Sequence, residues 1–186
     1  MEQAAAHPRA AIEVLVLHAG LAASGGARLR VAASCLLAIT HLGLLGEPNR
    51  SLGLANALSL VRATLPPRRW AASVAIATDI ADGLLTRRRG STAFGSYADP
   101  LADLTFWSSV AFQTRAGNMS RAAVIGLWLG PAIAITYAYF AYGRTIDYPR
   151  PLIVRRVSAV VQAMLVLHLV RGEWQPIKEA TSTQVS

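Results

Sequence analysis

The chain has 186 residues, of which 53% are hydrophobic and only 15% are charged, and its mean hydropathy is +0.38. The net charge is +8, and seventeen of the eighteen basic residues are arginines. These arginines stand in short clusters between apolar runs, whereas nucleic-acid-binding proteins carry their charge on a polar, lysine-rich surface. The composition therefore excludes a nucleic-acid partner and indicates one domain in contact with membrane lipid. Its single cysteine, Cys35, excludes a disulfide framework.

Seven apolar stretches follow one another along the chain, and none shows the alternation of a half-buried strand. They cover residues 10–24, 30–46, 51–65, 70–86, 98–114, 122–142 and 152–170. The stretch at 122–142 is long enough to cross a bilayer by itself, since about twenty residues suffice. The stretch at 10–24 also fits the apolar part of a secretory signal. We expect an all-α fold, a polytopic membrane bundle of about six helices.

The same pattern divides the chain into three parts. Residues 1–50 are expected to form N-terminal apolar helices, residues 51–171 a membrane domain, and residues 172–186 a polar, disordered tail. Arginines gather at 87–89 and again at 144–156. Because basic loops face the cytoplasm, we expect a multi-pass protein of the cell membrane with both clusters on the cytoplasmic side.

Four of the five aspartates fall within residues 79–103. Asp79 and Asp82 are three residues apart, and Asp99 and Asp103 are four apart, so each pair shares one face of a helix. The first pair closes one predicted span and the second pair opens the next. We therefore expect all four carboxylates to converge at the cytoplasmic end of a helical hairpin.

Carboxylates beside apolar sequence are costly unless a cation compensates them. Oxygen ligands without histidine or cysteine favour Mg²⁺ or Mn²⁺, and two pairs on facing helices suit two such ions, the arrangement that serves phosphoryl transfer. Two simpler interpretations stay open at this point. The acids could line an ion path, or they could be solvated loop charge.

The residues around the aspartates add a longer pattern. The order Asp79-x2-Asp82-Gly83-x2-Thr86-Arg87-x7-Gly95-x3-Asp99-x3-Asp103 resembles the signature of the CDP-alcohol phosphatidyltransferases, D-x2-D-G-x2-A-R-x8-G-x3-D-x3-D. Seven of the eight fixed residues are present. Thr86 replaces the alanine, and the loop between Arg87 and Gly95 is one residue short.

The resemblance implies an integral membrane enzyme of phospholipid biosynthesis. Such an enzyme moves a phosphatidyl-type group from a CDP-linked lipid to an alcohol and releases CMP. Carried over by position, Asp79, Asp82 and Asp99 would ligate metal, and Asp103 would lie beside the second ion and act as general base. Gly83 and Arg87 would contact the CDP moiety. Relatives of this type are generally homodimers.

Two further groups of polar residues are candidates for the site. Arg150, Arg155 and Arg156 could bind a phosphate on the acceptor alcohol, although anchoring at the cytoplasmic face alone would also explain them. Upstream, Asn56-x2-Ser59-x2-Arg62 resembles the opening of the helix that precedes the signature in this family. These side chains would either line the site or anchor a short interfacial helix.

The chain also departs from the family pattern. Only sixteen residues separate Arg62 from Asp79, whereas a full helical hairpin needs about forty. Either residues 51–65 form a half-helix or part of the usual first spans is lost, and no apolar run follows Arg171 to supply a last helix. The alternatives to a transferase are a divalent-cation transporter or channel component, and an inactive membrane scaffold that retains the motif. Gly83, Arg87 and Gly95 favour the transferase, because an ion path has no need of them.

Overall fold

The structure is a computed structural model that describes residues 2–25, 27–90, 92–114, 117–142 and 151–171. These residues form helices and no strand, so the predicted all-α class is confirmed; the expected number of about six was approximate. The helices are α1 Glu2–Ala6, α2 Pro8–Ala23, α3 Arg28–Thr40, the 3₁₀ helix η1 Leu42–Leu45, α4 Leu54–Thr64, α5 Arg69–Arg89, α6 Ala93–Gln113, α7 Asn118–Tyr142 and α8 Leu152–Val170. Each of the seven apolar runs corresponds to one of the helices α2–α8.

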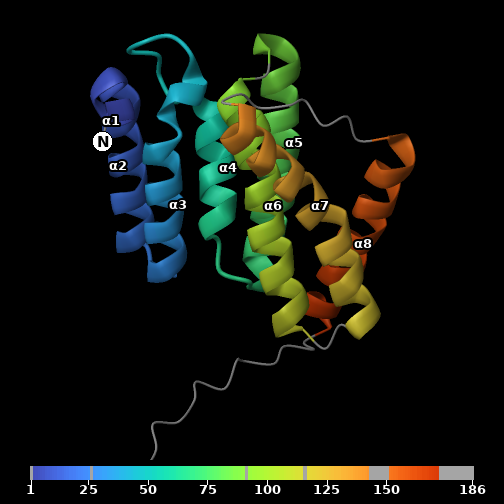
Figure 1. The fold of residues 1–186 in the computed structure, drawn as a ribbon. Helices are drawn as coiled ribbons and strands as arrows, with labels where there is room; N and C mark the ends of the chain where they lie inside the picture. Colours follow the sequence, from blue (N-terminus) through green and yellow to red (C-terminus); the bar gives the residue numbers. More distant parts are fainter. Residues whose placement is uncertain (1, 26, 91, 115–116, 143–150, 172–186) are drawn as a thin grey trace, which may run out of the picture.

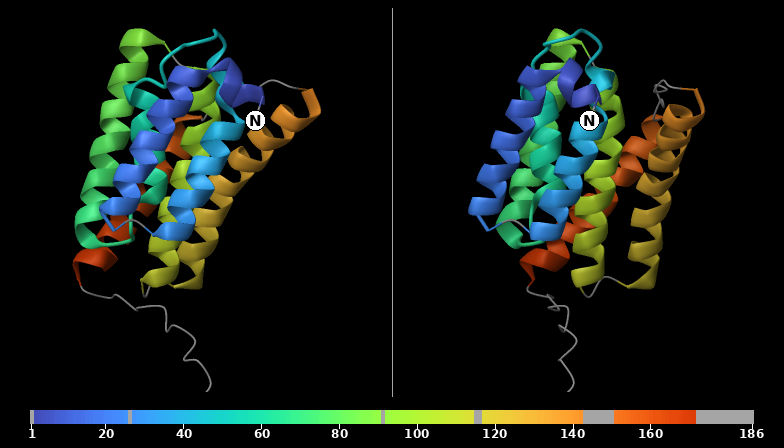
Figure 2. Two further views of the ribbon diagram at one scale, coloured as in Figure 1. Left: turned by 90° about the vertical axis from the view of Figure 1, so that its left-hand side faces the viewer. Right: turned by 60° about the vertical axis from the view of Figure 1, so that its left-hand side comes forward.

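The helices from α2 onward run alternately up and down, with α6 near the middle of the bundle (Figures 1 and 2). Helix α6 packs against α4 on one side and against α7 and α8 on the other. Helices α5 and α6 meet at the same end of the bundle at which α7 ends and α8 begins (Figure 1). The arginines at the end of α5 and those near the start of α8 are thus at one end, which agrees with the predicted alternation.

Two clusters of buried apolar side chains hold the bundle together. The first joins α5, α6, α7 and α8 and contains Phe106, Trp107, Trp128 and Leu165. The second joins the N-terminal helices to α4 and α6, and it includes Val14, Leu42, Leu60 and Phe94. Because burial of apolar surface is the main stabilising term, residues 1–50 are part of the packing that supports α4.

Helix α4 is short and ends inside the bundle. Its eleven residues rise about 16 Å, roughly half of a bilayer's hydrocarbon thickness. Pro66 and Pro67 follow it directly and cannot continue the helix. Of the two arrangements considered for residues 51–65, the structure therefore has the half-helix. The carbonyl of Leu65, at its end, accepts a hydrogen bond from Arg30 Nη1 on α3 at 3.2 Å.

The start of α4 is tied to the N-terminal hairpin by one carboxylate. Glu13 on α2 accepts hydrogen bonds from the Ser51 hydroxyl and, at 2.7 Å, from the backbone N–H of Leu52. A charged acceptor makes such bonds roughly twice as strong as neutral ones. Both ends of α4 are consequently held by side chains from residues 1–50.

Two of the described helices, Asn118–Tyr142 and Leu152–Val170, are long and apolar enough to cross a membrane. Only 33% and 22% of their most apolar windows are buried inside the bundle. Large apolar side chains such as Tyr137, Phe140 and Val160 therefore stand exposed on their outer faces. Such faces suit contact with lipid.

Candidate active site

A cavity of about 560 Å³ brings the four predicted aspartates together. Asp79 and Asp82 line it from α5, and Asp99 and Asp103 line it from α6. The spacings of three and four residues keep each pair on one helical face, as predicted, and α5 and α6, which both pack against α4, turn these faces toward a common space. The remaining lining comes from Ile80, Gly83, Arg87, Trp128, Arg155, Ser158, Ala159 and Gln162.

The four carboxylates differ in exposure. Asp82 and Asp103 are buried, at 7% and 5% relative exposure, whereas the side chain of Asp79 is 57% exposed and that of Asp99 is 34% exposed. The cavity is thus acidic from its floor to its mouth. A substrate or cation entering from solvent meets Asp79 and Asp99 first.

Arg62, on the last turn of α4, lies at the centre of the acidic cluster and is only 1% exposed. Its Nη1 lies 3.1 Å from Asp79 Oδ1, its Nη2 lies 3.5 Å from Asp99 Oδ1, and its Nε lies 3.0 Å from Asp103 Oδ1. Each nitrogen of one guanidinium therefore faces a different carboxylate. The upstream motif is compatible with two places for Arg62, in the lining of the site or at the membrane interface. The structure puts Arg62 among the aspartates.

Two other side chains hold the aspartates of α6 in place. The hydroxyl of Ser59, one turn before Arg62 on α4, donates a short hydrogen bond to Asp99 Oδ1. The indole Nε1 of Trp128 on α7 donates to Asp103 Oδ2 at 3.3 Å. Ser59 was visible in the upstream motif. Trp128 had no sequence signal, because a tryptophan in an apolar helix is ordinarily a packing residue.

The predicted ligand-binding residues divide into three groups. Gly83, Arg87 and Arg155 line the cavity. Arg156 is exposed and does not belong to the lining. Arg150 lies outside the described residues. Of the two described arginines proposed for the acceptor, Arg155 is therefore the one that lines the acidic cavity.

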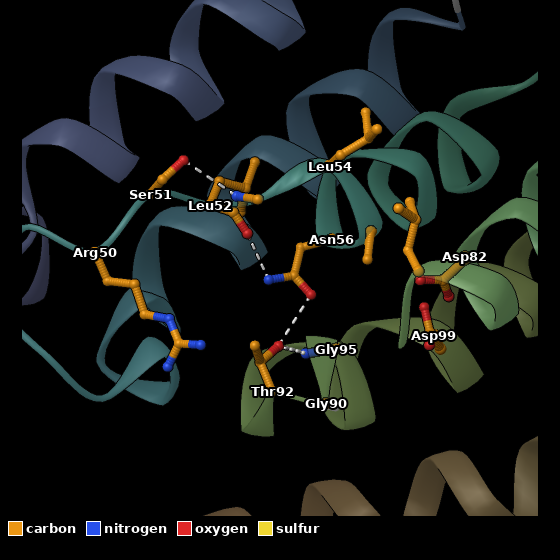
Figure 3. Close-up of a pocket in the computed structure, with 13 residues that line it drawn as sticks. Arg50, Ser51, Leu52, Leu54, Asn56, Asp82, Gly90, Thr92, Gly95 and Asp99 are labelled. Atoms are coloured by element: carbon orange, nitrogen blue, oxygen red, sulfur yellow. Dashed lines mark hydrogen bonds between the residues drawn. The ribbon is translucent and has the colours of Figure 1, made fainter. Parts of the chain in front are cut away.

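A second, smaller pocket of about 190 Å³ lies on the other side of Asp82 and Asp99, which line both spaces. Figure 3 shows these two carboxylates at one end of the pocket and Arg50 at the other. Asn56 and Thr92 lie between them. The two aspartates thus form the wall between a small polar pocket and the larger acidic cavity.

Close contact at the start of α6 explains the motif residue Gly95. Thr92 caps α6 by accepting a hydrogen bond from the Gly95 N–H at 2.9 Å, and its hydroxyl donates to Asn56 Oδ1 at 3.0 Å (Figure 3). A Cβ at position 95 would lie 2.9 Å from Asn56 Oδ1 and 3.2 Å from Thr92 Oγ1. Glycine at this position lets α4 approach the first turn of α6.

Replacing Gly95 by alanine is expected to destabilise the protein by about 1–3 kcal/mol, because Asn56 and Thr92 must move to admit the methyl group. The free energy of unfolding, measured in mixed detergent–SDS micelles, tests this. Gly126→Ala in α7 is the matched control, since a Cβ there meets no other atom within 4 Å and alanine favours a helix. Equal stability of the two variants would contradict the close contact.

The carboxylate oxygens of the four aspartates are suitable ligands for hard cations, but three of these aspartates are oriented toward Arg62 in the structure. Within the described residues, no three histidine, cysteine or acidic side chains form a group that could hold a metal ion as it stands. The oxygens that face the guanidinium would have to turn toward the ion. Asp79 and Asp99 are partly exposed and can rotate. The chemical type of these ligands therefore fits Mg²⁺ or Mn²⁺. The side chains must move before they can coordinate such an ion.

The geometry defines a helical bundle with an acidic cavity of the kind used in transfer of phosphate groups. The family model of the CDP-alcohol phosphatidyltransferases matches residues 58–183, well over half of the chain. The chain belongs to the CDP-alcohol phosphatidyltransferase family, as the signature predicted. No curated protein and no solved structure matches it.

Membership fixes the coarse chemistry. The family consists of membrane-bound transferases of phospholipid biosynthesis that take a CDP-alcohol donor and an alcohol acceptor and use divalent metal ions. The matched region begins within α4 and includes all four cavity aspartates together with Arg62, Trp128 and Arg155.

Proposed function

We propose that this protein transfers a phosphatidyl group from a CDP-linked lipid to an alcohol, with release of CMP. The observation that carries the proposal is the convergence of all four signature aspartates in one cavity. The oxygen of the acceptor hydroxyl would attack the phosphorus attached to the lipid. The bond from that phosphorus to the oxygen of CMP would break, and the hydroxyl proton would pass to a carboxylate.

Asp79, Asp82 and Asp99 are proposed to hold one divalent ion, and Asp103 to lie beside a second. Two Mg²⁺ or Mn²⁺ ions, when bound, would neutralise the diphosphate and make CMP a good leaving group. Arg87 has a fixed fork of donors that matches diphosphate oxygens. Gly83 has no side chain, so it leaves space for a ligand beside Arg87. A Cβ on Gly83 would meet only Arg87 Nη1, at 3.6 Å. Both residues are proposed to bind the CDP moiety.

Asp103 is proposed to accept the proton of the acceptor hydroxyl. Its Oδ1 forms an ion pair with Arg62 Nε, and its Oδ2 accepts a hydrogen bond from Trp128 Nε1. These donors fix the plane of the carboxylate, which favours proton transfer in a single geometry. One of the two contacts must lengthen as the proton arrives.

The acceptor is proposed to be a small alcohol that carries a phosphate. Arg155 on α8 lines the same cavity as the aspartates, and Ser158 and Gln162 lie on the same helical face. A guanidinium suits a phosphate, and the hydroxyl and amide groups suit the remaining hydroxyls of the alcohol. We retain Arg150 and Arg156 as neighbouring candidates near the same helix end.

We place the protein in the cell membrane as a multi-pass protein, with the cavity facing the cytoplasm, and we propose a homodimer. Support for this orientation comes from the arginines at 87–89 and 144–156, which the positive-inside rule assigns to the cytoplasmic side. The alternative of a cation transporter is less favoured, because a fixed guanidinium between the carboxylates opposes the passage of cations.

The proposal is tested by release of CMP from CDP-diacylglycerol by the purified full chain in lipid nanodiscs. A panel of acceptors would include glycerol 3-phosphate, inositol phosphate, inositol and serine. We expect release with a phosphorylated acceptor and Mg²⁺ or Mn²⁺, and none after chelation with EDTA or in Asp82→Asn. Release with serine or inositol alone would refute the phosphorylated acceptor. Absence of release with every acceptor would favour the inactive scaffold.

A further inference from the structure

Arg62 is the least expected member of the acidic cluster. It comes from α4, ahead of the aspartate motif, and it connects three carboxylates on two other helices. Each of its three nitrogens lies close to a different aspartate, and Nη1 also donates a hydrogen bond to Asp79 Oδ1. A buried guanidinium in such a position is costly unless its partners are all in place, so α4, α5 and α6 are held in register through it.

We propose that Arg62 is a tethered cation that competes with divalent ions for the aspartates and thereby sets how tightly they bind. The inference rests on the proposed function and assigns a positioning role to a residue outside the aspartate motif. Together with Arg87 and Arg155 in the lining, Arg62 brings three positive charges to four carboxylates, so the cavity keeps a net negative charge and still attracts cations. An ion that enters must nevertheless take oxygens that now face Arg62.

The exposures indicate which contacts exchange. Asp79 and Asp99 are partly exposed, and Asp99 is also held by Ser59. Asp103 is buried and held by Trp128 as well as by Arg62. The contacts of Arg62 with Asp79 and Asp99 are therefore the ones that an ion displaces. The contact with Asp103 persists and keeps this carboxylate in place during the reaction.

This arrangement predicts opposite changes in metal affinity and in turnover. Replacing Arg62 by glutamine removes a positive charge and a competitor, so the dissociation constant for Mn²⁺ should fall by about tenfold or more. Turnover should fall, because Asp103 loses the partner that orients it. A residue that served only to stabilise the fold would weaken ion binding and turnover together.

The experiment measures Mn²⁺ binding, by the electron paramagnetic resonance signal of free Mn²⁺, and CMP release in the same nanodisc samples. Arg62→Lys keeps the positive charge but loses the planar fork of guanidinium donors. The dissociation constant of this variant for Mn²⁺ should therefore fall by only about threefold. Arg121→Gln is the matched control. Arg121 is also partly buried, but its Nε donates to the Ala111 carbonyl and it does not line the acidic cavity, so its loss should leave Mn²⁺ affinity unchanged.

Mn²⁺ binding that is unchanged or weaker in a folded Arg62→Gln protein would overturn the inference. If Arg62→Gln does not fold, Arg62→Lys decides by the same criterion. Native protein that binds Mn²⁺ but releases no CMP with any acceptor would count against the proposed function alone, because the shift in affinity is still measured. Failure of the native protein and both variants to bind Mn²⁺ at about 10 mM, weaker than ordinary divalent sites, would overturn the inference itself.

Discussion

The Asp103→Asn substitution is expected to lower CMP release from a CDP-linked lipid by about a hundredfold to ten-thousandfold, the usual contribution of a positioned general base. Asparagine keeps the shape of the side chain but cannot take the acceptor's proton. It also has one acceptor oxygen where aspartate has two. Because Arg62 Nε and Trp128 Nε1 approach from both sides, the amide must turn its NH₂ toward one of these donors.

Steady-state release of CMP at saturating acceptor measures this effect, and unfolding in mixed micelles shows whether the variant is still folded. Glu47→Gln is the matched control, since Glu47 is an exposed acid outside both pockets. A folded Asp103→Asn protein with native turnover would show that another group removes the proton. A loss of turnover equal to that of Glu47→Gln would lead to the same conclusion.

The Trp128→Ala substitution is expected to cost about 3–5 kcal/mol of unfolding free energy, the range found for large-to-small changes in a core. Trp128 is 1% exposed and packs in the cluster that joins α5, α6, α7 and α8. Its removal leaves a cavity beside Asp103 and deprives that buried carboxylate of a donor. Both losses affect the surroundings of Asp103, so we expect a loss of unfolding free energy near the upper limit of this range.

Trp128→Phe separates the loss of packing from the loss of the hydrogen bond to Asp103. It retains most of the ring but removes the N–H, so it should cost roughly 1–2 kcal/mol while lowering turnover through Asp103. Leu129→Ala, at the partly exposed neighbouring position, provides the control for helix α7 and should cost less than either. If Trp128→Phe matched the native protein in turnover, the indole N–H would have no part in positioning Asp103.

The fold class followed from the sequence because apolar runs of this length have few alternatives to helices. The run at 152–170 coincides with α8, and the run at 122–142 lies within α7. Boundaries were less certain where polar residues continue a helix. Helix α5 extends to Arg89, beyond the apolar run at 70–86, and Arg87 and Arg88 in this last turn are exposed and need no core partner.

The grouping of the aspartates was also accessible, since their spacing follows the period of a helix and their two helices are adjacent in sequence. Contacts between distant segments were not. Arg62 and Asp103 are 41 positions apart in the numbering, and Trp128 reaches Asp103 from a third helix. The upstream motif allowed Arg62 two places, and only the packing of α4 against α6 distinguishes them. The roles assigned to these side chains stay predictions.

The short helix α4 has a consequence for the minimal functional unit. Its two ends are fastened by Glu13 and Arg30, both upstream of residue 58, where the family match begins. A polypeptide trimmed to the matched region would leave the helix that carries Arg62 without either fastening, and would bare Leu60 and Phe94. In this protein the N-terminal hairpin thus stabilises the position of α4 in the region that matches the family. A sequence comparison limited to residues 58–183 does not reveal this contribution.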